Sequence, residues 1–204
     1  AGELPYVRRF GDAIARGISK VNTKILVDFR ESYLKKLKKL SNKNTTITDK
    51  MPPNFKYVGL ICSAFPDAKI VHVKRNSAAT CWANYKQHFT TKSLGYSYDL
   101  NDLITYYGLY QNLMKFWEEQ YGDRIYTLNY ETLTINQEDE TRKLIQYLDL
   151  KWEQECLAPQ DNKRSVSTAS NSSKQIRQKI YQDSSQKWKK FEPFLNGVFN
   201  QLDD

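Results

Sequence analysis

The sequence has few cysteines and no long apolar run, and these two absences exclude several classes of protein. Its three cysteines, Cys62, Cys81 and Cys156, are scattered along 204 residues without a C-x-x-C spacing, so neither a disulfide framework nor a zinc site is indicated. No apolar run approaches the ~20 residues of a membrane-spanning helix. The first residues lack the basic and apolar segments of a signal peptide. We therefore expect a cytoplasmic protein that does not contact a membrane.

Acidic residues are in the minority. The chain has 31 Lys and Arg against 23 Asp and Glu, a net charge of +8, which is typical of proteins whose partner is nucleic acid, a membrane surface or a phosphate-rich ligand. A solvated basic surface explains the same excess, and composition alone favours that explanation. Hydrophobic residues make up 40% of the chain, enough for a good core, and we expect one domain over residues 1–204.

Extended and helical patterns alternate along the chain. Strands are expected at residues 45–49, 69–74 and 125–130, and the second of them is expected to be buried. Helices are expected at residues 54–65, 77–89, 99–120 and 138–148, with Gly122 capping the third, a loop at 161–173, and a basic amphipathic helix around 184–194. Strands separated by helices predict an α/β fold with a parallel sheet flanked by helices.

Arg75 lies between the strand expected at residues 69–74 and the helix expected at 77–89. Ligands of open parallel sheets bind beyond the carboxyl ends of the strands. The N-terminus of the following helix brings unpaired N–H groups and a positive dipole to the same place, and the planar guanidinium suits a phosphate. These features indicate an anion site. An arginine that pairs with a surface carboxylate is the alternative interpretation.

A second basic cluster lies late in the chain, where cations alternate with serines: Lys163, Arg164, Lys174, Arg177 and Lys179. Such a segment can surround a phosphate with hydroxyls, backbone N–H groups and cations. A flexible, solvated tail is the alternative. Apolar residues such as Ile176, Tyr181 and Trp188 are poor choices for a disordered segment, and we expect the segment to fold back onto the body of the protein.

Several stretches together resemble one known family. They are AGELP, TDKMPPNFKYVGLICSAFPDAKIVHVKRN, YYGLYQNLMKFW, IYTLNYETL, LDLKWEQECL and STASNSSKQIRQKIYQDSSQKWKKFE. In this order they resemble bacterial sulfotransferases related to the tetratricopeptide-repeat and, more distantly, the tyrosylprotein sulfotransferases, over nearly the whole chain. The resemblance implies a P-loop-nucleotide-hydrolase-like α/β fold. It also implies transfer of a sulfuryl group from 3′-phosphoadenosine 5′-phosphosulfate (PAPS) to a hydroxyl or amine, with no metal.

The resemblance assigns cofactor-binding roles near the first strand ends. Arg75 matches the arginine that grips the 3′-phosphate of PAPS, and Tyr130 matches a tyrosine beside the nucleotide. The family's serine eight positions after the arginine is Ala83 here. Thr80 or Ser77 is the candidate replacement for that hydroxyl.

The same resemblance extends into the serine-rich segment. Lys174 and Arg177 match its C-terminal contact to the 3′-phosphate, and Ser167 or Thr168 matches the loop near the 5′ side. These residues stand between the helix expected at 138–148 and the one expected around 184–194.

Two residues match catalytic positions. Lys50, in the Asp-Lys-x-Pro loop, matches a lysine that steadies negative charge at the transferred group, and Glu3 resembles the general base of the tyrosylprotein branch. An ordinary surface glutamate is an equal alternative for Glu3. His72 and His88 are the other candidate bases, and both fit structural roles better.

Family members begin with a strand, a phosphate loop and a helix, and this chain contains no such loop. The nearest stretch, GDAIARGISK at residues 11–20, has one residue too many between its glycines. We expect the first strand, loop and helix to be missing and activity to be impaired. Exposed strand edges are then expected to promote a homo-oligomer.

Three functions remain open after the sequence. They are an impaired sulfotransferase, a non-catalytic nucleotide-binding or interaction relative of that family, and a nucleic-acid-binding protein, which only the +8 charge suggests and which ranks last. Steep salt dependence would distinguish the third. The acceptor, whether a small molecule, a peptide or a carbohydrate, is not determined by any motif.

Overall fold

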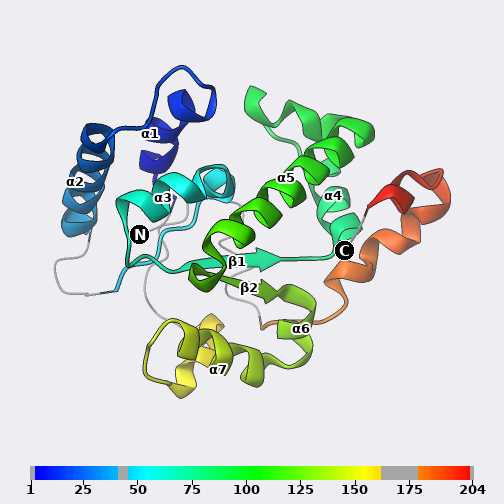
Figure 1. Cartoon of the computed structure of the whole chain (residues 1–204). Helices are drawn as coiled ribbons and strands as arrows, with labels where there is room; N and C mark the ends of the chain where they lie inside the picture. Colours follow the sequence, from blue (N-terminus) through cyan, green and yellow to red (C-terminus); the bar gives the residue numbers. More distant parts are fainter. Residues whose placement is uncertain (1–2, 41–45, 162–178, 203–204) are drawn as a thin grey trace. The chain divides into compact units, whose positions relative to one another are not determined.

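The computed structural model describes residues 3–40, 46–161 and 179–202. These residues form two compact units (Figure 1). The first unit contains the described residues up to 69 together with 113–124, and the second contains 70–112, 125–161 and 179–202. Helix α5 (Leu100–Tyr121) contributes residues to both units.

The first unit is helical. It contains α1 (Tyr6–Ala15), α2 (Thr23–Leu40), the 3₁₀ helix η1 (Pro52–Tyr57) and α3 (Val58–Ala64). Its core is aromatic: the Phe29 side chain is fully buried, and its ring lies 5.3 Å from those of Phe10 and Phe65. Arginines satisfy the last carbonyls of α3, because Arg30 donates to Ala64 O at 2.8 Å and Arg124 donates to Cys62 O at 3.0 Å.

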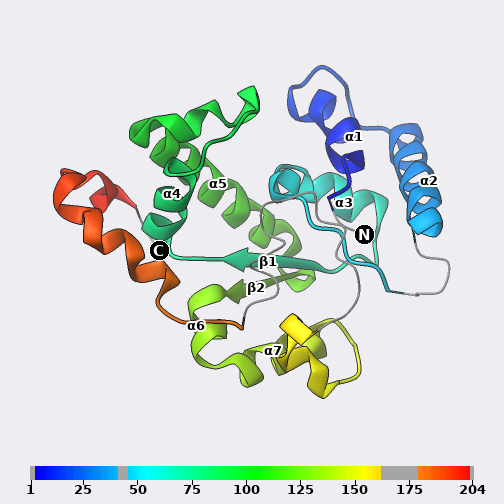
Figure 2. The ribbon, with the colours of Figure 1, turned by 180° about the vertical axis from the view of Figure 1, so that it is seen from behind.

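The second unit is built on two parallel strands, β1 (Ile70–Lys74) and β2 (Ile125–Asn129), paired from Ile70 with Ile125 to Lys74 with Asn129. Its helices are α4 (Ser77–Tyr85), α6 (Tyr130–Ile135) and α7 (Gln137–Tyr147). The 3₁₀ helices are η2 (Lys92–Tyr98), η4 (Gln154–Leu157), η5 (Pro159–Asp161), η8 (Ser184–Phe194) and η9 (Val198–Gln201). Figure 2 shows both strands from behind.

The core of the second unit joins distant segments. Cys81 of α4 and Leu103 of α5 pack in one cluster with Leu195 and Phe199 near the C-terminus. The last described segment is therefore part of the fold, as the apolar residues of the sequence predict. None of the helices in the described ranges combines the length and hydrophobicity that crossing a membrane requires.

The parallel α/β arrangement is confirmed, with differences in detail. Residues 46–49 form no strand, and Asp49 has only an isolated β-bridge. Side-chain hydrogen bonds hold this segment instead, since the Asp49 carboxylate accepts from Leu4 N and from Tyr33 OH. The strand expected to be buried is only partly so, since Val73 is 58% exposed. The helix expected at 77–89 ends at Tyr85.

The helix at residues 184–194 and the end of α5 also differ from expectation. Residues 184–194 form a 3₁₀ helix, in which Pro193 lacks the N–H of a helical donor. Gly122 does not cap α5 in a left-handed conformation and instead begins the 3₁₀ helix η3 (Gly122–Arg124). Of the loop expected at 161–173, only Asp161 is among the described residues, and it ends η5.

Two helical glycines give a matched test of the packing. A Cβ on Gly11 would lie 2.8 Å from Tyr57 Cε1, whereas one on Gly108 would meet nothing within 4 Å. We expect Gly11→Ala to lower the free energy of unfolding by about 1–3 kcal/mol through overpacking. Gly108→Ala should raise it by up to about 1 kcal/mol through helix propensity. Urea unfolding measures both, and stabilisation by Gly11→Ala would contradict this packing.

Candidate functional site

The candidate site begins where β1 ends. Lys74 is the last residue of β1 and Ser77 is the first of α4, so Arg75 occupies the turn between them. Asn76 caps the helix, because its side-chain oxygen accepts from Ala79 N at 2.9 Å. This cap fixes where the helix begins and holds Arg75 at the carboxyl end of the strand.

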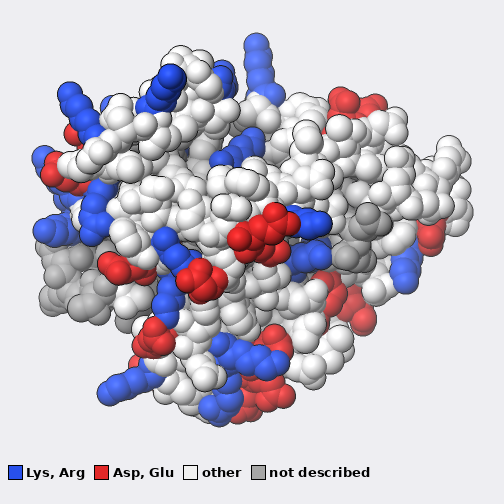
Figure 3. Space-filling view, in the orientation of Figure 1, with Lys and Arg blue, Asp and Glu red and all other residues white. Residues whose placement is uncertain are grey.

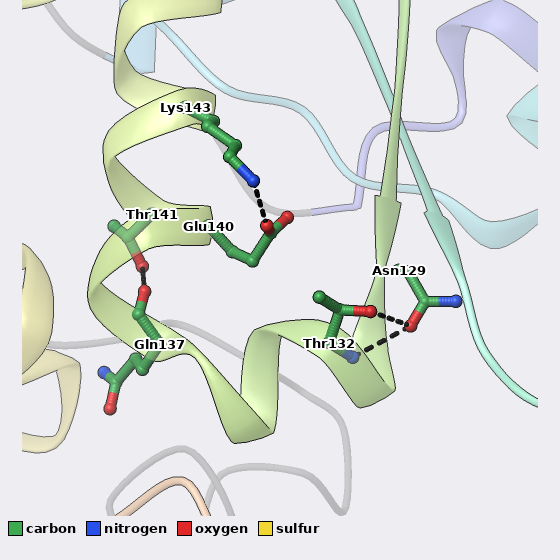
Figure 4. A network of polar contacts seen from close by, with 6 residues as sticks. All are labelled: Asn129, Thr132, Gln137, Glu140, Thr141 and Lys143. Carbon is green, nitrogen blue, oxygen red and sulfur yellow. Dashed lines mark hydrogen bonds and ion pairs between the residues drawn. The ribbon is translucent and has the colours of Figure 1, made fainter.

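The end of β2 is built in the same way. Asn129 accepts from Thr132 N at 2.9 Å and from Thr132 Oγ1 at 3.0 Å, which starts α6 directly after the strand (Figure 4). Tyr130 and Glu131 therefore occupy the first turn of α6. Because Lys74 pairs with Asn129, the parallel register brings this turn beside Arg75.

The first residues of η8 hold one edge of the Arg75 guanidinium. Nε donates to Ser185 Oγ at 3.1 Å and Nη2 donates to Ser184 O at 3.0 Å. The guanidinium carbon lies 5.5 Å from the centroid of the Tyr130 ring, within cation–π range. Ser184 Oγ donates to Tyr130 OH at 3.2 Å. The Arg75 side chain thus has a defined orientation between the first residue of α6 and the first residues of η8.

Glu131 completes this cluster. Its carboxylate accepts from Asn76 N, at 3.2 Å and 3.3 Å to its two oxygens, and from Ser185 Oγ. Ser185 itself is only 5% exposed. Arg75 therefore has a carboxylate nearby, as the alternative interpretation of this arginine supposes, but the hydroxyl of Ser185 links the two groups.

The guanidinium retains donors suited to an anion. Arginine has five N–H groups in a planar fork, and the contacts at Ser184 and Ser185 involve only Nε and Nη2. No described residue accepts from Nη1. A phosphate could bind along the Nη1–Nη2 edge with the geometry that arginine forms with phosphates. The residues present at this point fit an anion with the geometry of a phosphate.

The hydroxyls of Thr80 and Ser77, the candidate replacements for the serine that is Ala83 here, are poorly suited to bind a phosphate. Thr80 Oγ1 donates to Asn76 O at 2.9 Å, within its own helix. Ser77 is 2% exposed, and Ala83 lies on the exposed face of α4. Thr80 therefore directs its hydroxyl proton to the helix backbone and not to a phosphate.

Glu3 and Lys50 lie in the first unit, where they form an ion pair. The neighbouring Asp49 fixes this loop, because it accepts from Leu4 N at 3.3 Å and from Tyr33 OH at 2.8 Å. Burial, and then the hydrogen bond to Asp49, raise the pKa of the Tyr33 hydroxyl. The Glu3 and Lys50 side chains remain 44% and 69% exposed, so both ends of the pair reach solvent.

The remaining candidate site residues contribute nothing to the Arg75 cluster as the structure describes it. Ser167, Thr168, Lys174 and Arg177 lie outside the described residues. His72 contacts Tyr110 OH through Nε2, and a second hydrogen bond joins its Nδ1 to the hydroxyl of Thr127. His88 is exposed. In the described ranges, no group of three or more His, Cys, Asp or Glu side chains could hold a metal ion.

Sequence reasoning missed Glu131, Ser184 and Ser185. Glu131 belongs to the Tyr-Glu pair after the second strand, and the two serines precede Trp188 in DSSQKW. Both stretches belong to the motifs that carry the family resemblance, but only the structure shows that they meet at Arg75. On the face drawn in Figure 3, Lys and Arg side chains are interspersed with Asp and Glu, so the +8 charge forms no single basic field there.

The comparisons with known proteins show the family of this chain. A family model described as "Sulfotransferase family" matches residues 19–154. A protein of Aquifex aeolicus (strain VF5), described as "Uncharacterized protein", is 33% identical over 220 residues; the alignment covers all of this chain and 29% of that relative. The chain belongs to the sulfotransferase family, and it spans less than a third of the length of this relative.

The buried face of α4 supplies a pH test. Cys81 is fully buried, and burial raises its pKa from 9.0 to about 12. The folded state holds the Cys81 thiol proton more tightly than the unfolded state does. The contribution of this thiol to the free energy of unfolding is therefore complete below pH 9 and is lost as the pH rises through 12. At about pH 10.5 the loss is about 2 kcal/mol.

Urea unfolding at about pH 8 and pH 10.5 checks this expectation. The free energy of unfolding should fall with pH in the wild type and fall less in Cys81→Ala. An equal fall in both proteins would show that this thiol does not titrate as its burial requires.

Proposed function

We propose that this chain carries the 3′-phosphate-binding part of a PAPS-dependent sulfotransferase that acts on a hydroxyl or amine acceptor. One observation supports the proposal above the others: Arg75, at the carboxyl end of a parallel strand, is held by one edge and has its Nη1 donors directed away from Ser184 and Ser185. The family membership of the chain supports the same reaction class.

The roles in this proposal follow from charge. When bound, PAPS supplies an activated sulfuryl group whose leaving group is a phosphate. Arg75 binds the 3′-phosphate through its Nη1–Nη2 edge, as a charge-assisted fork. Tyr130 orients that guanidinium by lying under it at 5.5 Å. This binding energy positions the reacting group for an in-line transfer, in which catalysis rests on positioning and charge stabilisation.

We assign the chemical step to two residues, as the family resemblance implies. Lys50 steadies negative charge at the transferred group, and Glu3 takes the proton of the acceptor. The two side chains form an ion pair and remain 69% and 44% exposed, so both are accessible to a substrate. A small alcohol, a peptide hydroxyl and a carbohydrate hydroxyl all satisfy this chemistry.

A non-catalytic nucleotide-binding relative is the second candidate. Ala83 favours it, because the position that resembles the family's phosphate-binding serine has no hydroxyl. Nucleic-acid binding ranks last, and the mixed charges on the face in Figure 3 do not favour it. Binding of DNA would weaken steeply with salt through counterion release.

The first test is calorimetric titration with adenosine 3′,5′-bisphosphate. Arg75→Ala should weaken binding by about ten- to a hundredfold, the value of a charge-assisted fork. Arg9→Ala is the matched control, since Arg9 is exposed on α1 and its loss changes the net charge equally. Equal affinities of the two variants would overturn the assignment of Arg75.

The second test separates catalysis from binding. Transfer of labelled sulfuryl from PAPS is measured with phenol, tyrosine-peptide and sugar acceptors. Glu3→Gln should lower kcat by about a hundredfold, the usual value of a general base, and leave the affinity for the bisphosphate unchanged. Glu31→Gln, a change at an exposed position of α2, is the control. Turnover that survives Glu3→Gln would remove Glu3 from the mechanism.

A further inference from the structure

Glu131 and Ser185 form a chain of hydrogen bonds beside the Arg75 guanidinium. Ser185 is 5% exposed, and its hydroxyl lies between a cation and an anion: Arg75 Nε at 3.1 Å on one side and the Glu131 carboxylate on the other. An ionised carboxylate only accepts hydrogen bonds. Ser185 must therefore donate its proton to Glu131, which leaves its lone pairs directed toward Arg75.

We propose that Glu131 and Ser185 are a positioning pair that fixes which edge of the Arg75 guanidinium faces the ligand. Glu131 sets the direction of the Ser185 hydroxyl, and Ser185 then binds Nε. Ser184 O binds Nη2 on the same edge at 3.0 Å. With that edge occupied, the guanidinium can present only the Nη1–Nη2 edge to an anion. This inference rests on the proposed role of Arg75 in binding the nucleotide.

Glu131 also fixes the backbone at the site. Its carboxylate accepts from Asn76 N, the residue after Arg75 and the cap of α4. Tyr107 OH donates to Arg75 O at 3.4 Å. Both the peptide and the side chain of Arg75 are therefore held from neighbouring elements. A surface arginine with a free side chain would lose rotamer entropy on binding, and this arginine has lost much of it already.

A ligand-free measurement tests the positioning directly. In the wild type, the Arg75 Nε–Hε group should give a slowly exchanging NMR signal, identified by its absence in Arg75→Lys. Ser185→Ala and Glu131→Ala should broaden that signal or speed its exchange. Ser93→Ala and Glu138→Gln are the controls, since both lie on exposed positions of the same unit. An unchanged Nε–Hε signal in both variants overturns the pair, whatever the protein binds.

Affinity for adenosine 3′,5′-bisphosphate tests the consequence. Ser185→Ala and Glu131→Ala should each weaken binding by about fivefold, the value of one hydrogen bond. The double variant should lose about as much as Glu131→Ala alone, because both residues act through Arg75. Fivefold losses that add in full would instead mean two independent structural effects and would contradict the proposal.

The two measurements separate the inference from the function on which it rests. If Arg75→Ala leaves the affinity unchanged, the proposed function fails at this residue, while the Nε–Hε signal still decides whether the pair positions the arginine. Far-UV circular dichroism confirms that each variant is folded. Ser185→Ala removes a single buried oxygen, so it remains a test if Glu131→Ala does not fold.

Discussion

The candidate site depends on one interaction, the contact between the start of η8 and one edge of the Arg75 guanidinium. Arg75 leaves β1 with its Nε bound to Ser185 and its Nη2 bound to Ser184. These residues are more than a hundred positions apart in the sequence, so one side chain joins the end of a strand to the start of η8. Loss of the arginine removes a tie of the fold and the candidate anion site together.

A comparable device fixes the first unit. The Asp49 carboxylate accepts from Leu4 N and from Tyr33 OH, which ties the chain before α1 and one face of α2 to the loop that carries Lys50. In the first unit the Asp49 carboxylate fixes the backbone, and the neighbouring Lys50 side chain remains 69% exposed. In the second unit the Glu131 carboxylate fixes the backbone at Asn76, and the neighbouring Arg75 uses only Nε and Nη2 in its contacts with Ser184 and Ser185.

Much of the fold can be predicted from the sequence, because periodic apolar residues mark α5 and α7 and alternating ones mark β2. The site is harder. Arg75 is recognisable at the seam between β1 and α4, but Ser184 and Ser185 carry no local signal of the long-range contact with it. The 3₁₀ form of η8 is likewise hidden, since an amphipathic pattern does not distinguish it from an α-helix. The segment before Lys50 shows β-branched residues, yet side-chain bonds to Asp49 hold it instead of a strand ladder.

We propose that the Arg75 cluster binds the 3′-phosphate of an adenine nucleotide. The most direct measurement is a calorimetric comparison of adenosine 3′,5′-bisphosphate with adenosine 5′-monophosphate on the unmodified chain. We expect loss of the 3′-phosphate to weaken binding by about tenfold or more. Equal affinity for the two nucleotides would contradict it.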